Sequence, residues 1–431
     1  MLAAGRPASG TPEPERAAAP PVAAPAGPLV LALMCLVSLN LRSVSVGVSP
    51  VLPLIRQDFA VSYALAGVLF ALPIAMMGLG AEPGRRLVDR AGPWRAISLS
   101  LALIGVGGGL RALAPNFWAM LALTALFGAG IGLAQPSLPR LVAQWFPTRR
   151  AFATGVYSAG LTGGAVVGAS LTALLLPALG ALSWRGTCLL WAALAILSLV
   201  AWLALGPRRD ATPPGPPSRQ GKGERDGSGR GARGVGPTPI WRDRVAWLIT
   251  LLFLLQSMGF YQLVGWLPSY YQELGLSLEA ASVPFTVLNL ASLPCGLLAS
   301  YLSDRVGQRR PFVAVGALML LAGMTGLLMT PLHPAWLWTT LAGGGIGIVF
   351  TLALALPTDL LDPRRAGPTV SLVFTVGYGA ALVSPLLAGV LRDAFGSFTL
   401  ALLPTVGTAL AMLATAFALP ETARGLRGPA A

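Results

Sequence analysis

Long runs of apolar residues dominate the chain from Leu29 to Leu419, and short polar turns separate them. Twelve of these runs reach the length of about 20 apolar residues that an α-helix needs to cross a bilayer. Their centres lie near Arg42, Ile74, Leu103, Gly130, Gly163, Leu194, Ser257, Asn289, Met319, Gly347, Tyr378 and Met412. Runs of this length contradict the in-and-out alternation of a membrane β-barrel, which has about ten residues per strand. The pattern therefore predicts an all-α membrane protein with twelve transmembrane helices.

Polar segments at both ends and in the middle interrupt this pattern. Residues 1–28 are rich in Ala and Pro, and the stretch from Pro207 to Pro239 is rich in Gly, Pro, Ser and Arg. Such compositions are typical of flexible tails and linkers. We therefore expect a disordered cytoplasmic tail over 1–28, a six-helix bundle over 29–206, a flexible cytoplasmic linker over 207–241, a second six-helix bundle over 242–420 and a cytoplasmic tail over 421–431.

The composition of the 431 residues excludes most other classes of protein. Charged residues make up 11% of the chain and hydrophobic residues 55%, with a mean hydropathy of +0.70, whereas charged residues make up about 25% of an ordinary soluble domain. A disordered chain, a disulfide scaffold and a soluble enzyme are therefore excluded. The three cysteines and the one histidine, His333, have no metal-site spacing and no neighbouring carboxylate pair. We expect no enzyme activity, no metal and no cofactor.

The net charge of +14 is explained by membrane topology. Of the 30 basic residues, 24 fall on the side shared by both termini and the linker. Four fall on the opposite side, namely Arg56, Arg111, Arg185 and Arg392. The positive-inside rule then places both termini in the cytoplasm of a multi-pass membrane protein. The use of Arg over Lys and the abundance of Ala, Gly and Pro indicate a GC-rich bacterial genome, so we expect the inner membrane. Because the basic residues follow membrane topology, we expect no nucleic-acid partner. We also expect a monomer.

The two halves of the chain match each other at a constant offset of 215 residues. This offset places Pro53 on Pro268, Asp89-Arg90 on Asp304-Arg305, Gly130-Ile131-Gly132 on Gly345-Ile346-Gly347, and Arg149-Arg150-Ala151 on Arg364-Arg365-Ala366. Because each half has six predicted spans, both halves enter the membrane from the same side. Secondary transporters use such parallel repeats, whose two bundles rock around a site near the membrane midplane. A duplicated scaffold without transport activity is the alternative.

The loops after the second and eighth spans carry the same motif, Asp-Arg-x-Gly-x-x-Arg. It runs from Asp89 to Arg95 and from Asp304 to Arg310. This pattern resembles the cytoplasmic loop signature of the major facilitator superfamily. The resemblance implies two pseudo-symmetric six-helix bundles in which Asp89 and Asp304 cap facing helix ends in one conformation, where the helix dipole favours an anion. It assigns conformational gating to Asp89, Arg90, Arg95, Asp304, Arg305 and Arg310.

Arg42 is the one ionised residue near the centre of a predicted span. Placing a guanidinium there costs about 2.5–3.5 kcal/mol on insertion scales, and Arg does not lose its proton to avoid that cost. Helical spacing puts Ser38 and Ser45 on the same face, as a helix that lines a cavity requires. No acidic residue has a comparable depth, which argues against cationic cargo. The pattern favours an anionic or strongly dipolar small-molecule substrate, and an arginine satisfied by backbone carbonyls at a helix interface is the alternative.

Further polar residues near mid-depth complete the candidate site. The predicted substrate-binding residues are Arg42, Ser38, Ser45, Asn40, Gln135, Gln256, Ser257, Tyr261, Asn289 and Tyr378. Each is about as good a candidate for packing as for binding, and Asn40 lies about 200° around the helix from Arg42. Together they supply the few polar contacts that orient a small solute in a largely apolar pocket.

A narrower resemblance rests on short segments spread over both halves. They are Asn40-Leu41-Arg42, Pro50-Val51-Leu52-Pro53, the run from Phe146 to Arg150, Leu255-Gln256-Ser257 and Trp266-Leu267-Pro268. In these segments the chain resembles the bacterial cyanate and 2-nitroimidazole transporter (CynX/NimT) family. The resemblance implies a secondary active transporter that moves a small anion or polar heterocycle by alternating access. The alternatives are a broad-specificity drug efflux pump in which Arg42 is structural, and a non-transporting membrane sensor or scaffold.

Overall fold

The structure is a computed structural model of the whole chain, which describes residues 27–146, 150–179, 183–206 and 240–420. Every regular element within these ranges is helical, because a chain in lipid satisfies its backbone hydrogen bonds within each helix. The all-α prediction is therefore confirmed. The predicted tails and linker lie outside the described residues, except that residues 27–28 begin the first helix and residues 240–241 begin a short helical turn.

The first half of the chain forms one bundle. Its helices are α1 (Gly27–Val46), α2 (Leu52–Asp58), α3 (Tyr63–Leu110), α4 (Phe117–Ala134), α5 (Ser137–Trp145), α6 (Arg150–Leu179) and α7 (Ser183–Leu205), with 3-10 turns η1 (Ser49–Val51) and η2 (Arg111–Leu113). Side chains cap several of these helices: Ser62 accepts a hydrogen bond from the Leu65 amide, and Asn116 accepts one from the Ala119 amide. Such caps satisfy amides that have no partner inside the helix.

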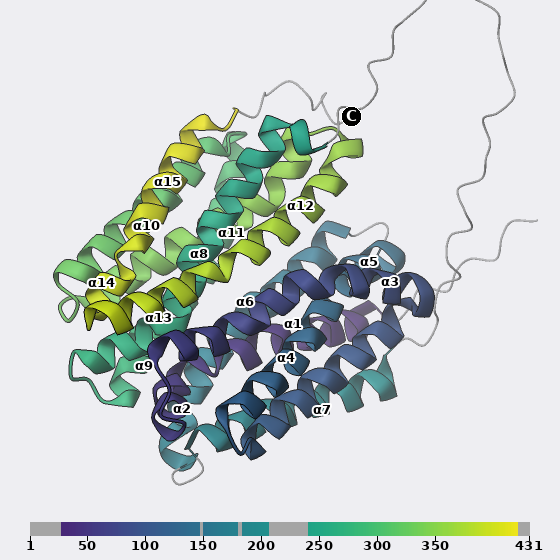
Figure 1. The fold of residues 1–431 in the computed structure, drawn as a ribbon. Helices are drawn as coiled ribbons and strands as arrows, with labels where there is room; N and C mark the ends of the chain where they lie inside the picture. The colour runs from purple at the N-terminus through teal and green to yellow at the C-terminus, as the bar shows by residue number, and fades with distance from the viewer. Residues whose placement is uncertain (1–26, 147–149, 180–182, 207–239, 421–431) are drawn as a thin grey trace, which may run out of the picture.

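The second half forms a second bundle that lies beside the first (Figure 1). It consists of the 3-10 turn η4 (Ile240–Arg242) and the helices α8 (Arg244–Glu273), α9 (Leu278–Val306), α10 (Arg310–Met329), α11 (Ala335–Leu360), α12 (Pro363–Ala381), α13 (Val383–Phe395), α14 (Phe398–Leu402) and α15 (Pro404–Ala418). The two-bundle arrangement is the one that the internal repeat predicts.

Ten helices of the described residues are long and apolar enough to cross a membrane. One of them contains all of α3, whose 48 residues would extend about 72 Å at 1.5 Å per residue, more than twice the hydrocarbon thickness of about 30 Å. A break at Gly92, with φ of 81°, divides α3 into the second and third predicted spans. The 30-residue α6 is not among the ten and coincides with the fifth predicted span. The count of twelve stays a prediction, and these two helices are where the two further spans fit.

The break in α3 has a counterpart in the second half. Gly92 and Gly307 both have a positive φ, 81° and 72° respectively, and they are separated by the repeat offset of 215 residues. Glycine permits a positive φ without steric cost, but the ψ angles differ, at 159° for Gly92 and 20° for Gly307, so the two loop motifs turn the chain differently. We call the end of the molecule that carries Gly92 and Gly307 the motif end, and the end that carries Asp58 and Asp393 the far end.

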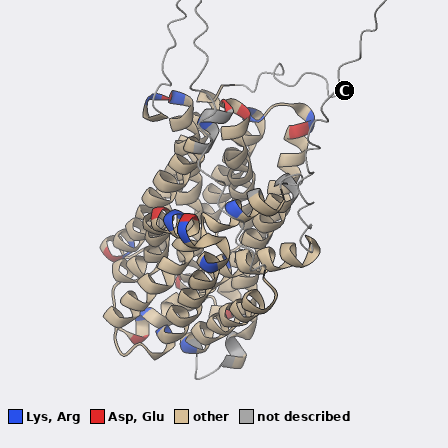
Figure 2. Cartoon of the chain, turned by 90° about the vertical axis from the view of Figure 1, so that its right-hand side faces the viewer, with Lys and Arg blue, Asp and Glu red and all other residues tan. Residues whose placement is uncertain are grey.

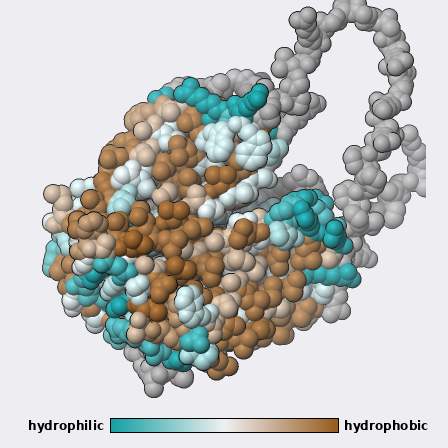
Figure 3. Space-filling model, in the orientation of Figure 1, coloured by the Kyte–Doolittle hydropathy of each residue, from teal (hydrophilic) through white to brown (hydrophobic). Residues whose placement is uncertain are grey.

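Apolar side chains cover much of the outer surface. Large hydrophobic residues such as Leu113, Leu174 and Met329 are 74–77% exposed, and Figure 3 shows extended brown surface over both bundles. Charged residues are few and most of the ribbon in Figure 2 is tan. An apolar surface of this extent is expected where lipid rather than water is the solvent.

Glycines of α6 bring this helix into close contact with α1. A Cβ atom at Gly160 would lie 2.7 Å from the Cys35 carbonyl oxygen, and one at Gly168 would lie 2.7 Å from the Ser43 carbonyl oxygen. Small residues four apart on one helix permit this approach in membrane proteins. The contact fixes the rotation of α1 about its own axis, and therefore the direction in which Arg42 points.

Candidate binding site between the two bundles

Arg42 projects from α1 of the first bundle toward α8 of the second. Its guanidinium carbon lies 5.0 Å from the centroid of the Phe260 ring and 5.6 Å from that of Tyr261. Its Nη1 atom is buried and has no hydrogen-bond partner among the described residues, and no acidic side chain of these residues forms an ion pair with it. The cation is therefore held at the interface by aromatic faces, without a counter-charge.

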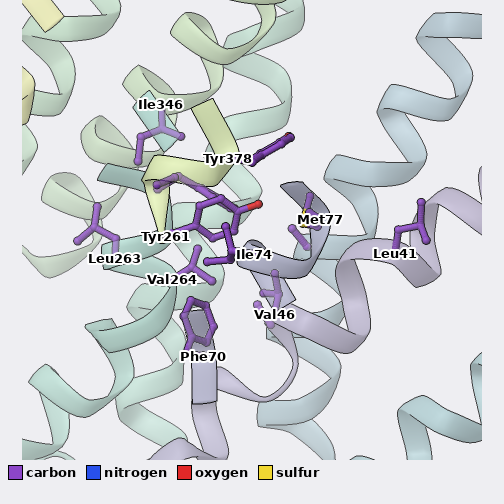
Figure 4. Packing of buried hydrophobic residues seen from close by; sticks show 14 of the residues in the cluster. Leu41, Val46, Phe70, Ile74, Met77, Tyr261, Leu263, Val264, Ile346 and Tyr378 are labelled. Carbon is purple, nitrogen blue, oxygen red and sulfur yellow. The ribbon is translucent and has the colours of Figure 1, made fainter. Parts of the chain in front are cut away.

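Beside Arg42 lies a small cavity of about 30 Å³. Its lining includes Arg42 and Ser45 of α1, Phe70, Ile74 and Met77 of α3, Arg111 of η2, Phe127 of α4, and Tyr261 and Val264 of α8. Figure 4 shows Tyr261 of α8 close to Ile74, with Phe70 and Val46 below these two residues in the view. The cavity therefore joins residues of both bundles in this conformation.

Aromatic rings form one wall of the site. The Phe374 and Tyr378 rings of α12 are stacked, with centroids 5.7 Å apart and an interplanar angle of 9°. Phe253 and Tyr261 of α8 approach Tyr378 edge-on at 5.2 and 6.3 Å. Tyr378 interacts electrostatically with the Arg42 guanidinium, and the buried Tyr261 hydroxyl has no hydrogen-bond partner among the described residues. A cation next to flat ring faces suits planar solutes that carry negative charge or hydrogen-bond acceptors.

Two of the predicted binding residues of α1 face other helices of the first bundle. The Ser38 hydroxyl donates to the Met34 carbonyl at 2.7 Å, and its Cβ packs against Gly160 of α6. The Asn40 amide donates to the Ser198 hydroxyl of α7 at 2.6 Å and to the Leu36 carbonyl at 2.9 Å. Both contacts hold helices together in this conformation. A direct contact of either residue with substrate stays a prediction.

The predicted polar residues of the second bundle are also bonded within their own bundle. Gln256 donates to the Ile346 carbonyl of α11 at 3.5 Å and accepts from the Ser257 hydroxyl at 3.3 Å. Asn289 of α9 donates to the Phe285 carbonyl at 2.9 Å, and its oxygen is buried without a partner among the described residues. Gln135 follows the last residue of α4 and does not line the cavity. Arg42, Ser45 and Tyr261 are thus the predicted residues that the structure brings together around the cavity.

Arg111 lines the same cavity, although its position at the end of a predicted span indicated a surface charge. Only 3% of its surface is exposed, and its Nε atom has no hydrogen-bond partner among the described residues. The guanidinium carbon lies 5.3 Å from the centroid of the Phe127 ring. The one signal in the sequence was that Arg111 directly follows a long apolar run with no acidic residue nearby.

The predicted gating residues form ion pairs within each bundle. Asp89 lies 2.8 Å from Arg85 and 3.9 Å from Arg140 of α5, and Arg309 links Asp304 to Asp359 of α11. Arg90, Arg95 and Arg305 are exposed, and the Arg310 guanidinium lies over the Phe417 ring. In the described residues, no hydrogen bond or ion pair joins the two bundles at the motif end in this conformation. Their gating role stays a prediction.

Hydrogen bonds to backbone amides join the two bundles at the far end. The Asp393 carboxylate of α13 accepts hydrogen bonds from the backbone amides of Tyr63 and Ala64 at 3.0 and 2.7 Å, and so caps the start of α3. The Arg392 guanidinium lies over the Tyr63 ring at 4.8 Å and is paired with Glu273 at 2.6 Å. A hollow between the bundles is visible toward the right of Figure 3, the side on which α3 and α5 carry their labels in Figure 1. The molecule is thus closed at the far end and open toward the motif end.

Known proteins share both the sequence pattern and the fold. The family model described as Major Facilitator Superfamily matches residues 31–385. The cyanate transport protein CynX of Escherichia coli strain K12 is 30% identical over 373 residues, which cover 86% of this chain and 91% of that protein. The 2-nitroimidazole transporter of the same strain is 29% identical over 386 residues, which cover 89% and 93%. The narrower resemblance inferred from short segments is therefore confirmed.

A solved structure agrees with the fold. The crystal structure of a bacterial homolog to the human lysosomal transporter Spinster superposes with a TM-score of 0.74 at 18% identity, and the match covers 90% of this chain and 96% of that chain. The relatives named above are transporters and not enzymes, as the sequence predicted for this chain. The chain belongs to the Major Facilitator Superfamily, and its role is membrane transport.

Proposed function

We propose that the protein is a secondary transporter that carries a small anion or polar heterocycle, similar to cyanate or 2-nitroimidazole, across the bacterial inner membrane by alternating access. One observation carries this proposal. Arg42 lies at the interface of the two bundles with a buried nitrogen that has no partner among the described residues. A midplane charge is costly and is retained where it meets a substrate or an ion.

The energetics support an anionic or strongly dipolar cargo. A unit negative charge 4 Å from the guanidinium gains about 4 kcal/mol at an effective dielectric constant of 20. This gain exceeds the cost of about 2.5–3.5 kcal/mol for placing arginine at the centre of a span. A cationic cargo would meet repulsion of the same size, and the described part of the cavity lining contains no carboxylate to offset it.

The asymmetry between the two ends supports alternating access. The Asp393 cap closes the far end in this conformation, and cargo would reach Arg42 from the motif end. In the opposite conformation the far end would open, and the motif residues Asp89 and Asp304 would approach the facing bundle. Rocking of two related bundles around a central site is the mechanism that parallel repeats permit.

The orientation and the cargo class rest on different observations. The excess of basic residues at the motif end supports an orientation in which that end and both termini face the cytoplasm. The named cargo of the relatives, cyanate for one and 2-nitroimidazole for the other, supports a small planar or linear solute. We expect the monomer to be functional, because the site lies between two bundles of one chain.

A second candidate function is favoured by the position of the guanidinium between aromatic rings. Contacts of 5.0 and 5.6 Å to the Phe260 and Tyr261 rings also fit a structural cation–π role. In that case the protein would be a broad-specificity efflux pump for apolar compounds, and Arg42 would hold the bundles together. A sensor or scaffold without transport is the third alternative.

Flux measurements in proteoliposomes distinguish these alternatives. We expect saturable uptake of radiolabelled cyanate or 2-nitroimidazole that is lost in Arg42→Gln and partly retained in Arg42→Lys. Arg86→Gln is the matched control, because Arg86 is exposed and the substitution removes the same charge. Equal flux in wild type and Arg42→Gln would favour the efflux pump, and no flux of any solute would contradict a transport function.

A further inference from the structure

Arg111 has no partner that explains its charge. It lies in η2 (Arg111–Leu113), directly after the end of α3. Only 3% of its surface is exposed, and its buried Nε atom makes no hydrogen bond to the described residues. The described residues also provide no carboxylate within ion-pair distance of its guanidinium. A buried guanidinium without a counter-charge is unfavourable unless another anion reaches it.

Two of the other three arginines at the far end are held by carboxylates, whereas Arg56, like Arg111, has a buried Nε without a partner among the described residues and lies over an aromatic ring, that of Tyr63. Arg185 is paired with Asp58 at 2.8 Å, and Arg392 is paired with Glu273 at 2.6 Å. Arg111 has instead the Phe127 ring face at 5.3 Å and the C-terminal end of α3, whose dipole attracts a cation only modestly. These contacts leave the donor at Nε unused.

Arg111 and Arg42 line the same cavity. Both side chains line the space of about 30 Å³ between the bundles, Arg42 from α1 and Arg111 from η2. The other lining residues are apolar or neutral, and none is acidic. Two like charges thus surround one small space. Each guanidinium has five N–H donors and no acceptor, so the groups repel each other and jointly attract a negative charge.

We propose that Arg111 is a second substrate-binding residue, which forms with Arg42 a two-guanidinium subsite for a small anion. This inference rests on the proposed function and narrows it, because a neutral heterocycle would leave both charges uncompensated. An anion with acceptor atoms at both ends can accept hydrogen bonds from both groups. Arg111 lies nearer the far end than Arg42. It would therefore hold the anion at the side where the anion enters or leaves when the far end is open.

Binding measurements on the purified full chain test the role of Arg111. The probes are cyanate and 2-nitroimidazole, both measured at pH 6, where cyanate is an anion and 2-nitroimidazole keeps its ring N–H proton and is mostly neutral. We expect Arg111→Gln to weaken cyanate binding at least about tenfold, which corresponds to one unpaired charge–ligand contact, and Arg111→Lys to recover part of it. Binding of 2-nitroimidazole should change less than twofold. Arg185→Gln is the matched control, because it removes the same charge at the same end from a half-exposed ion pair.

The melting temperature of the unliganded protein distinguishes a binding role of Arg111 from a structural role, because the two roles predict opposite changes when Arg111 is replaced. If Arg111 is an uncompensated charge, Arg111→Met removes its desolvation cost, and the melting temperature should stay equal or rise. The stabilisation that cyanate confers on the wild type should be lost at the same time. A lower melting temperature with unchanged cyanate affinity would overturn the proposal and make Arg111 a structural residue.

The failure of this inference can be distinguished from failure of the proposed function. If Arg42→Gln abolishes cyanate binding while Arg111→Gln leaves it intact, Arg42 is the anion site and Arg111 is not part of it. If cyanate and 2-nitroimidazole bind with the same dependence on Arg111, the charge-based argument is wrong. If neither probe binds or is transported by the wild type, both proposals are contradicted.

Discussion

Replacement of Asp393 by Asn should shift the protein away from the conformation seen here. The Asp393 carboxylate is the group through which the second bundle accepts hydrogen bonds from the first, at the start of α3. Both acceptor oxygens are used, one by the Tyr63 amide at 3.0 Å and one by the Ala64 amide at 2.7 Å. The contact exists only while the far end is closed. Weakening it therefore favours the conformation that is open at the far end.

The size of the shift follows from the geometry of this cap. Loss of a side-chain cap at a helix N-terminus costs about 0.5–2 kcal/mol, and the negative charge adds about 0.3–1 kcal/mol through the helix dipole. Asn retains one acceptor oxygen and loses the charge, and the contact is solvent-exposed. We therefore expect a change of about 1 kcal/mol in the equilibrium between the two conformations, or a factor of about five in their population ratio.

Distance measurements between spin labels at the far end detect this shift. Suitable labelling positions are Pro115→Cys in the first bundle and Ala280→Cys in the second, which are both exposed, in a chain whose native cysteines are replaced by Ala. Asp393→Asn should enlarge the population with the longer distance. Asp58→Asn is the matched control, because Asp58 lies at the same end and its partners, Trp184 and Arg185, belong to its own bundle. An equal shift in both variants, or none in Asp393→Asn, would refute the reasoning.

Two further predictions concern the packing that orients α1. Gly164→Ala should destabilise the protein by about 1–3 kcal/mol, because a new Cβ atom would lie 2.9 Å from the Leu39 Cα atom. Gly163→Ala is the control, because its new Cβ atom meets no atom within 4 Å and should leave stability unchanged. Thermal unfolding in detergent compares the two variants, and equal melting temperatures would contradict the packing. Asn40→Ala should lower stability by about 1 kcal/mol through loss of its bond to Ser198 without changing the affinity for cyanate, and a tenfold loss of affinity would instead make Asn40 a ligand.

The sequence predicted the architecture because membrane solvation constrains it strongly. Apolar runs of about 20 residues have few alternatives to helices in lipid, so the helices followed from hydropathy. The division into two bundles followed from the polar middle segment and the internal repeat. The repeat offset of 215 residues aligns Gly92 with Gly307, and both glycines have a positive φ in equivalent loops. Arg42 was identified from the sequence because a charge at the centre of an apolar run has a high energetic cost.

The directions of individual side chains were not accessible from the sequence. Ser38 and Asn40 lie close to Arg42 along α1, but close packing on α6 and α7 turns them toward those helices. Arg111 follows the end of a span, where a charge usually reaches water or lipid headgroups, and its direction depends on how α3 and α4 pack. Burial of Arg111 is therefore a tertiary property that hydropathy does not encode.

The conformational state was equally inaccessible to sequence reasoning. The loop motifs directed attention to Asp89 and Asp304, whereas the hydrogen bonds that join the bundles here involve Asp393 at the far end. Two conformations that differ by a few kcal/mol share one sequence, so the residues that hold each conformation are identified only when that conformation is seen. Asp393 has no motif around it that would have indicated its role.

The most direct test of the account is the position of a bound anion relative to Arg42. Selenocyanate is a close analogue of cyanate, and its selenium atom gives an anomalous signal in crystals of the protein grown with the anion. We expect an anomalous peak in the cavity between the bundles, with the anion within hydrogen-bond distance of the Arg42 guanidinium and absent in Arg42→Gln crystals. A guanidinium bonded to a carboxylate or to backbone carbonyls, with selenium elsewhere or nowhere, would contradict the central claim.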